Sequence, residues 1–212
     1  MEANYKPQED LMAIRNMMER SSKYLSLSGL SGIFAGCCAI VGAAFAYFFL
    51  LDAGSIRYDE YMRSLGKAST FSIRLSLFVT AIVVLIVAFS GAIYFSFRKA
   101  KKNHLQFWSK TTKQLLIHLF IPLVAGGLFS LILIFQNNIH LVAATTLIFY
   151  GLALVNAGKY TFGEIHYLGL SEIVLGLLAG LFINFGILFW TLGFGVLHIV
   201  YGFVMYQKYE RR

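Results

Sequence analysis

The 212-residue chain is too apolar for a soluble domain. Hydrophobic side chains make up 58% of it and charged ones 13%, whereas about a quarter of the residues in soluble proteins are charged. The net charge of +8 does not indicate a nucleic-acid partner, because the charges lie between apolar runs instead of on one folded basic face. The composition therefore predicts a protein whose main partner is the lipid bilayer.

Residues 1–24 precede the first apolar run. Within this segment and just after it, Leu11, Ile14, Met18 and Leu25 recur at helical spacing. This pattern is typical of an amphipathic helix lying at the cytoplasmic membrane interface; a cytoplasmic extension of the first helix is the alternative. The segment has no apolar core and no small-residue cleavage site, so we expect no removable signal peptide.

Six apolar stretches follow, each close to the roughly 20 residues that a spanning helix needs. The last two are separated by the short break Asn184–Gly186; read as one helix they would be about 57 Å long, nearly twice the hydrocarbon core. We therefore predict an all-α fold, a six-helix transmembrane bundle over residues 25–206 with a basic tail at 207–212. The predicted spans are 25–51, 71–97, 115–135, 139–155, 168–183 and 187–206.

The lysines and arginines predict the orientation. Of the 18 in the chain, fourteen lie before the first span, in the second or fourth loop, or after the last span. Since cytoplasmic segments carry the Lys/Arg excess, we expect both termini in the cytoplasm. The second loop is the most basic, and its cations are predicted to bind anionic lipid headgroups or a cytoplasmic protein partner: Arg98, Lys99, Lys101, Lys102, Lys110 and Lys113.

Two spans carry small residues four positions apart, Gly32 and Gly36 in the first and Gly176 and Gly180 in the fifth. Such spacing lets helix backbones approach closely, which provides van der Waals contact where lipid supplies no hydrophobic drive. We predict that these four glycines are packing positions. Association of the chain into a homo-oligomer is a further alternative that the sequence leaves open.

Glu172 and His198 are the candidate functional residues. An ionisable group at bilayer depth costs at least a few kcal/mol and normally faces protein or water. Glu172 lies on the helix face of Gly176 and Gly180, so we expect it to point into the bundle. It stands 13 residues before Phe185 and His198 stands 13 after it, so an antiparallel hairpin sets the two side chains level.

The same counting from the third connection, near Asn137, sets His118 and Asn156 level, close to the cytoplasmic interface. With Glu164 and His166 they are predicted to form the mouth of a polar site. A carboxylate beside an imidazole could relay protons, hold a cationic ligand or bind a metal. The alternative is a Glu–His hydrogen bond that only locks two helices together. The metal stays undetermined, and no cofactor is predicted.

No catalytic signature accompanies these residues. The sequence contains no H-E-x-x-H pair, no G-x-S-x-G elbow and no phosphate-binding glycine loop. A non-enzymatic protein that acts by binding, sensing or signalling is therefore favoured. A small transporter or channel with Glu172 and His198 as its coupling site is the alternative, and a membrane-embedded metal- or cofactor-dependent enzyme is the third hypothesis.

Residues 18–32, MERSSKYLSLSGLSG, resemble the start of a group of uncharacterised bacterial integral membrane proteins of the kind found in Bacteroidota. The resemblance implies a location in the bacterial inner membrane. It implies no functional residue.

Overall fold

The structure, a computed structural model, describes residues 27–50, 69–104 and 107–211. Every regular element in these ranges is helical, and six helical segments are long and apolar enough to cross a membrane. The predicted all-α bundle of six spans is therefore confirmed. The interfacial helix predicted in residues 1–24 lies outside the described residues.

The spans differ from the predicted ranges mainly at their ends. The first consists of α2 (Gly29–Phe45) and the π-helical turn η1 (Ala46–Leu50), and the second and third are α4 (Ser69–Lys102) and α5 (Lys110–Phe135). The fourth comprises η3 (Ile139–Leu141), α6 (Val142–Ala157) and η4 (Gly158–Tyr160), and the fifth is α7 (Gly163–Leu181). The sixth comprises η5 (Ile183–Phe185), α8 (Gly186–Trp190), η6 (Thr191–Leu197) and α9 (His198–Tyr209).

Local capping sets both ends of α5. The helix begins five residues earlier than predicted because Ser109 and Thr112 form a capping box, each side chain accepting from the other's backbone amide. It ends where Asn137 takes up a left-handed conformation with φ 61°, and the amide of Asn138 donates to the carbonyl of Leu133 at 2.8 Å. This is the usual geometry of a helix C-terminus, and it makes the tight third connection.

The sixth span is not a uniform α-helix. The short 3-10 turn η5 separates α7 from α8, so the predicted break near Asn184 is confirmed. Beyond α8, the chain passes through the π-helical segment η6, which contains the buried residues Gly193 and Gly195. Short π-helical segments within α-helices often occur at functional sites. Nothing in the hydrophobic pattern indicated this one.

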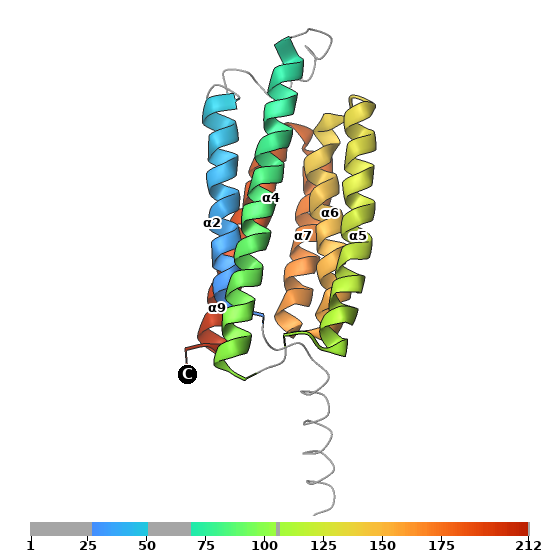
Figure 1. The fold of residues 1–212 in the computed structure, drawn as a ribbon. Helices are drawn as coiled ribbons and strands as arrows, with labels where there is room; N and C mark the ends of the chain where they lie inside the picture. Colours follow the sequence, from blue (N-terminus) through green and yellow to red (C-terminus); the bar gives the residue numbers. More distant parts are fainter. Residues whose placement is uncertain (1–26, 51–68, 105–106, 212) are drawn as a thin grey trace, which may run out of the picture.

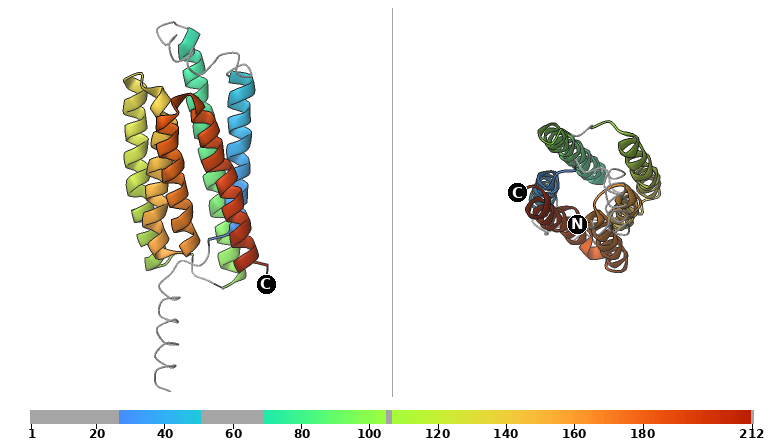
Figure 2. Two further views of the ribbon diagram at one scale, coloured as in Figure 1. Left: turned by 180° about the vertical axis from the view of Figure 1, so that it is seen from behind. Right: turned by 90° about the horizontal axis from the view of Figure 1, so that it is seen from below.

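The spans pack as two groups that the sixth span connects. One group consists of α2 with α4 and α9, and the other of α5, α6 and α7 (Figure 1). Figure 2 shows α9 alongside α2 from behind and from below. The preceding α8 packs on α6 and α7, and η6 contacts both α2 and α7. The sixth span therefore passes from one group to the other. The end of the bundle where α9 ends is called the C-terminal end below.

Glycines line the two closest helix crossings. A β-carbon at Gly36 would stand 2.6 Å from the carbonyl oxygen of Gly195, and one at Gly32 would stand 3.0 Å from the Cα of Gly202. On α7, a β-carbon at Gly176 would stand 2.9 Å from the backbone nitrogen of Ile148 on α6. These three predicted packing glycines therefore lie where one backbone directly faces another.

The fourth predicted packing glycine, Gly180, differs from the other three. Its added β-carbon would meet only the Cβ of Ala144, at the ordinary contact distance of 3.7 Å. The spacing missed two tight contacts. One is between Gly151 and Gly169, since a β-carbon on either would stand 2.6 or 2.7 Å from the other's carbonyl oxygen, and the other is between Gly29 and Gly202, where a β-carbon on either would overlap the other's carbonyl oxygen. The residues of each pair lie in different spans, so a pattern within one helix could not reveal them.

We expect Gly36→Ala to destabilise the bundle. The new β-carbon would meet backbone atoms of Gly195 and Ile199, and backbone cannot swing aside as a side chain does. Overpacking of this kind costs about 1–3 kcal/mol, measurable as a lower Tm of the purified protein in detergent. Gly127→Ala on α5 is the control, because nothing lies within 4 Å of its added β-carbon. An equal loss in both variants would contradict the assignment.

Candidate functional site

The structure brings Glu172 and His198 together. Glu172 Oε1 on α7 lies 3.4 Å from Nδ1 of His198, which is the first residue of α9. Glu172 is 0% exposed and His198 is 6% exposed. The two residues that the sequence placed at one depth are thus neighbours inside the bundle.

The hydrogen bonds of His198 determine which ring nitrogen carries a proton. Nδ1 lies 3.0 Å from the backbone carbonyl oxygen of Gly193, and a carbonyl only accepts, so Nδ1 donates to it. Nε2 lies 2.7 Å from the hydroxyl of Tyr150 on α6, and in the neutral ring it accepts from that hydroxyl. His198 is therefore held on both sides, by the backbone of η6 and by α6.

The carboxylate of Glu172 is left unsatisfied by this arrangement. Neither oxygen accepts a hydrogen bond from any of the described residues, because the Nδ1 hydrogen of His198 is directed to Gly193. Most buried polar side-chain atoms have a partner, and an unpaired one costs about 1–3 kcal/mol, or more when it is charged. Glu172 is thus a fully buried acidic side chain that receives no hydrogen bond from the described residues.

An apolar cluster lies beside the carboxylate. Leu147 and Ala179 belong to the buried cluster at this level, with Leu175, Phe189 and Phe194 packed against it. The missing side chain of Gly193 makes the room, since a β-carbon there would overlap Glu172 Oε2 and stand 2.5 Å from Leu147 Cδ2. A carboxylate in such surroundings is screened little by water, so charge at this position has a large effect on the energy.

Aromatic rings close one side of the site. The ring of Phe194 lies 4.9 Å from both Tyr150 and Trp190 between centroids, and Tyr150 lies 5.3 Å from His198. These rings pack around the imidazole, whose Nε2 is bound to the Tyr150 hydroxyl.

Tyr150 and Gly193 were missed by the sequence analysis. A signal for Tyr150 was present, because Tyr150 lies 13 residues after Asn137, just as His198 lies 13 after Phe185. Counting every polar residue from its nearest turn would have placed it level with Glu172. For Gly193 no signal exists, because the need for a glycine arises from the carboxylate of another helix.

The predicted mouth residues do not join this centre. His118 is exposed and its ring stacks on Tyr160 at 5.0 Å, and His166 is exposed. Asn156 is partly exposed. Glu164 is bound by Lys208 and by the hydroxyl of Tyr209. Within the described residues, no contact links these four predicted mouth residues to Glu172.

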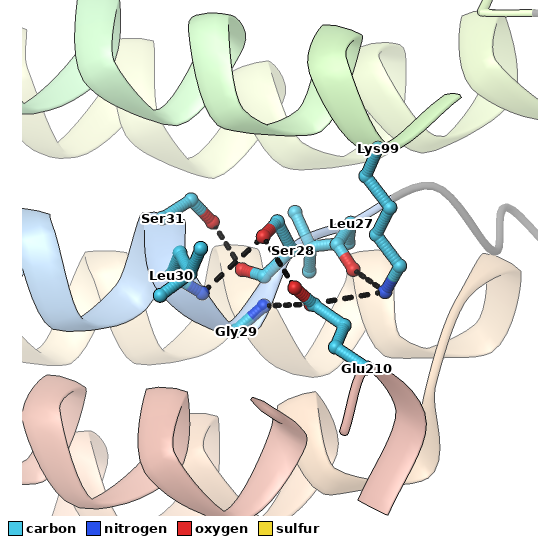
Figure 3. A network of polar contacts seen from close by, with 7 residues as sticks. All are labelled: Leu27, Ser28, Gly29, Leu30, Ser31, Lys99 and Glu210. Atoms are coloured by element: carbon cyan, nitrogen blue, oxygen red, sulfur yellow. Dashed lines mark hydrogen bonds and ion pairs between the residues drawn. The ribbon is translucent and has the colours of Figure 1, made fainter. Parts of the chain in front are cut away.

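A second polar network lies at the C-terminal end (Figure 3). The carboxylate of Glu210 accepts from the amide of Gly29 at 2.6 Å and from the hydroxyl of Ser28 at 3.1 Å. Lys99 on α4 lies 3.2 Å from the same carboxylate and donates to the carbonyl of Leu27 at 2.6 Å. Glu210 thus caps the N-terminus of α2 from another part of the chain, where helix amides favour a negative charge.

This network changes two expectations. Lys99 was predicted to face lipid headgroups, but it is 9% exposed and paired with Glu210, so it serves the fold. The residues after 206 were predicted to be a basic tail; instead α9 runs to Tyr209 and Glu210 docks on α2 and α4. The other five cations of the second loop are exposed, and their contact with headgroups stays a prediction: Arg98, Lys101, Lys102, Lys110 and Lys113.

Metal chemistry finds little support in the described part of the chain. No group of three or more His, Cys, Asp or Glu side chains there could hold a metal ion. Comparisons with family models, with curated proteins and with solved structures found no match for this chain. Function must therefore be argued from the site itself.

We expect Glu210→Gln to destabilise the protein much more than Glu164→Gln. The first change keeps an acceptor for the α2 amide but leaves Lys99 buried without its counter-charge, and breaking a buried pair in this way costs about 3–5 kcal/mol. The second change removes a pair whose lysine is 58% exposed, which is worth about 0–1 kcal/mol. Thermal unfolding in detergent measures both.

A double variant tests whether the loss comes from the buried charge. Adding Lys99→Met to Glu210→Gln removes the unpaired ammonium and should restore much of the lost stability, since apolar replacements of buried pairs are often neutral. If the double variant is as unstable as the sum of the two single variants, the ion pair does not account for the effect.

Proposed function

We propose that this chain is a non-enzymatic integral membrane protein of the bacterial inner membrane that binds a proton or a small cation at Glu172 and acts by binding or sensing. The observation that supports the proposal is the buried carboxylate of Glu172, whose two oxygens accept no hydrogen bond from the described residues. A bound positive charge would supply what these oxygens lack.

The alternative, a Glu–His contact that only joins two helices, fits the hydrogen bonds less well. His198 already ties the sixth span to α6 through Tyr150, and its other nitrogen is bound within the sixth span. Glu172 adds no hydrogen bond to this tie. A structural role would be served by an apolar residue, without the cost of several kcal/mol that an ionisable group at bilayer depth carries.

Transport is the second candidate function. It is favoured by the position of the π-helical segment η6, whose Gly193 directly faces the carboxylate. Interrupted helices beside an ion site are a recurring feature of secondary transporters. A transporter and a sensor would share the same binding residue, so flux measurements are needed to tell them apart.

The binding proposal predicts a response that depends on Glu172. A ligand that binds the folded protein raises its stability, by about 2.7 kcal/mol at a hundredfold excess over Kd. We expect the Tm in detergent to rise with acidification or with one of lithium, sodium or potassium chloride over choline chloride, and Glu172→Gln to abolish that rise. Glu164→Gln, on the same helix, should retain it. A full response in Glu172→Gln would contradict the proposal.

Flux decides between the two functions. Proteoliposomes loaded with a pH-sensitive or sodium-sensitive dye would show ion movement that Glu172→Gln abolishes if the protein is a transporter. Absence of flux from wild-type protein that retains the Glu172-dependent rise in Tm would favour the sensor.

The proposed orientation, with both termini in the cytoplasm, is supported by the Lys/Arg distribution and tested by labelling. In a Cys37→Ser, Cys38→Ser background, Lys110→Cys should react with a membrane-impermeant maleimide only after the cells are opened. Ser64→Cys, in the loop predicted to lie outside, should react with intact cells. The reverse pattern would overturn the orientation and with it the proposed headgroup and cytoplasmic partners of the basic loop.

A further inference from the structure

We infer that the ligand of Glu172 is a proton and that it reaches the carboxylate through His198, Tyr150 and Tyr201. This inference rests on the binding function proposed above and narrows it. The site lacks ligands for a metal cation, its hydrogen bonds allow a proton to be relayed, and a further buried hydroxyl continues the row.

The groups around Glu172 do not suit a metal cation. Hard cations such as Ca²⁺ and Mg²⁺ take about six or more oxygen ligands. The carbonyl of Gly193 and the hydroxyl of Tyr150, which hold His198 beside Glu172, are already bound to the imidazole. Within the described residues, no group of three or more His, Cys, Asp or Glu side chains could hold a metal ion. A proton needs a single oxygen, and Glu172 provides it.

The hydrogen bonds of His198 allow one proton to pass with balanced charges. The Tyr150 hydroxyl transfers its proton to Nε2, and the imidazolium releases the Nδ1 proton to Glu172 Oε1. Tyr150 regains a proton from the Tyr201 hydroxyl, and Tyr201 takes one from water at the C-terminal end. Glu172 ends neutral, and His198 ends neutral with its proton on Nε2. The Nδ1–Oε1 separation of 3.4 Å is longer than a hydrogen bond, so a small movement of the Glu172 side chain completes the step.

Tyr201 is placed to supply Tyr150. It lies three residues after His198 on α9, which is about one turn and therefore on the same helix face. Tyr150 and Tyr201 both pack against the buried cluster of Leu154, Ile165 and Leu168. The Tyr201 hydroxyl is buried without a hydrogen-bond partner among the described residues, although a buried tyrosine usually finds one.

The elements packed on α7 bring few other titratable groups to the carboxylate. Segments α8 and η6 contain none in their sequences. Among the described residues, the titratable groups that face Glu172 are His198 from α9 and Tyr150 from α6. Since Tyr201 follows His198 toward the end of α9, the row runs from Glu172 toward the C-terminal end.

Infrared difference spectroscopy of the full chain in detergent tests both the proton as ligand and its route to Glu172. Acidification should produce the C=O stretch of a neutral carboxylic acid that Glu172→Gln removes, and the band should not respond to sodium or potassium chloride at constant pH. After a pH jump, the band should rise about tenfold more slowly or worse in Tyr201→Phe and Tyr150→Phe, as expected when a positioned proton donor is lost. Its final height should be unchanged.

Tyr167→Phe is the matched control, because Tyr167 is 71% exposed on α7, and it should leave the rate at the wild-type value. Equal rates in all three Phe variants would overturn the relay while leaving proton binding intact. A Tm that rises with sodium at constant pH only when Glu172 is present, without a carboxylic acid band, would overturn the assignment of the ligand as a proton. The proposed binding function would remain. Loss of both responses would overturn the binding function as well.

Discussion

The polar interior of this protein depends on where the Nδ1 hydrogen of His198 goes. It is given to the carbonyl of Gly193, five residues earlier in the same span, instead of to Glu172 across the helix crossing. The imidazole is thereby held rigidly by its own span and by Tyr150, while the carboxylate beside it keeps both oxygens free of donors from the described residues. A fully buried carboxylate next to Leu147 and Gly193 then lacks a positive partner, and a bound positive charge would stabilise it.

The backbone of the sixth span determines this arrangement, and the side chains pack around that backbone. The π-helical turn of η6 aims the Gly193 carbonyl at the imidazole, and the absent side chain of Gly193 admits the carboxylate of α7. The close approach of α2 to the sixth span, at Gly36 and Gly195, holds η6 from the other side. The site around Glu172 and His198 therefore depends on the same helix packing as the glycine contacts.

Much of this architecture was predictable because bilayer thickness constrains it. Six apolar stretches of spanning length and the break at Asn184 follow from composition and helix rise, and counting from that break placed Glu172 beside His198. Helix ends were predicted less well, since the capping box at Ser109 and the docking of Glu210 on α2 act beyond the apolar runs. Lys99 was taken for a surface cation because its partner is 111 residues away. No sequence signal indicated the π-helical turn, because the turn arises from the packing of η6 against neighbouring helices and not from the conformational preferences of its own residues.

The clamp at Glu210 also bears on how the bundle is assembled. Gly29 and Ser28 receive their partner from a residue 181 and 182 positions later in the chain. Ser28 caps α2 locally, but during translation the Gly29 amide and Lys99 lack the Glu210 carboxylate until the ribosome has made residue 210. Contacts with such large sequence separation form late and slowly. The pairing of Lys99 with Glu210, which joins α4 to the residue after α9, can therefore form only after all six described spans have been synthesised.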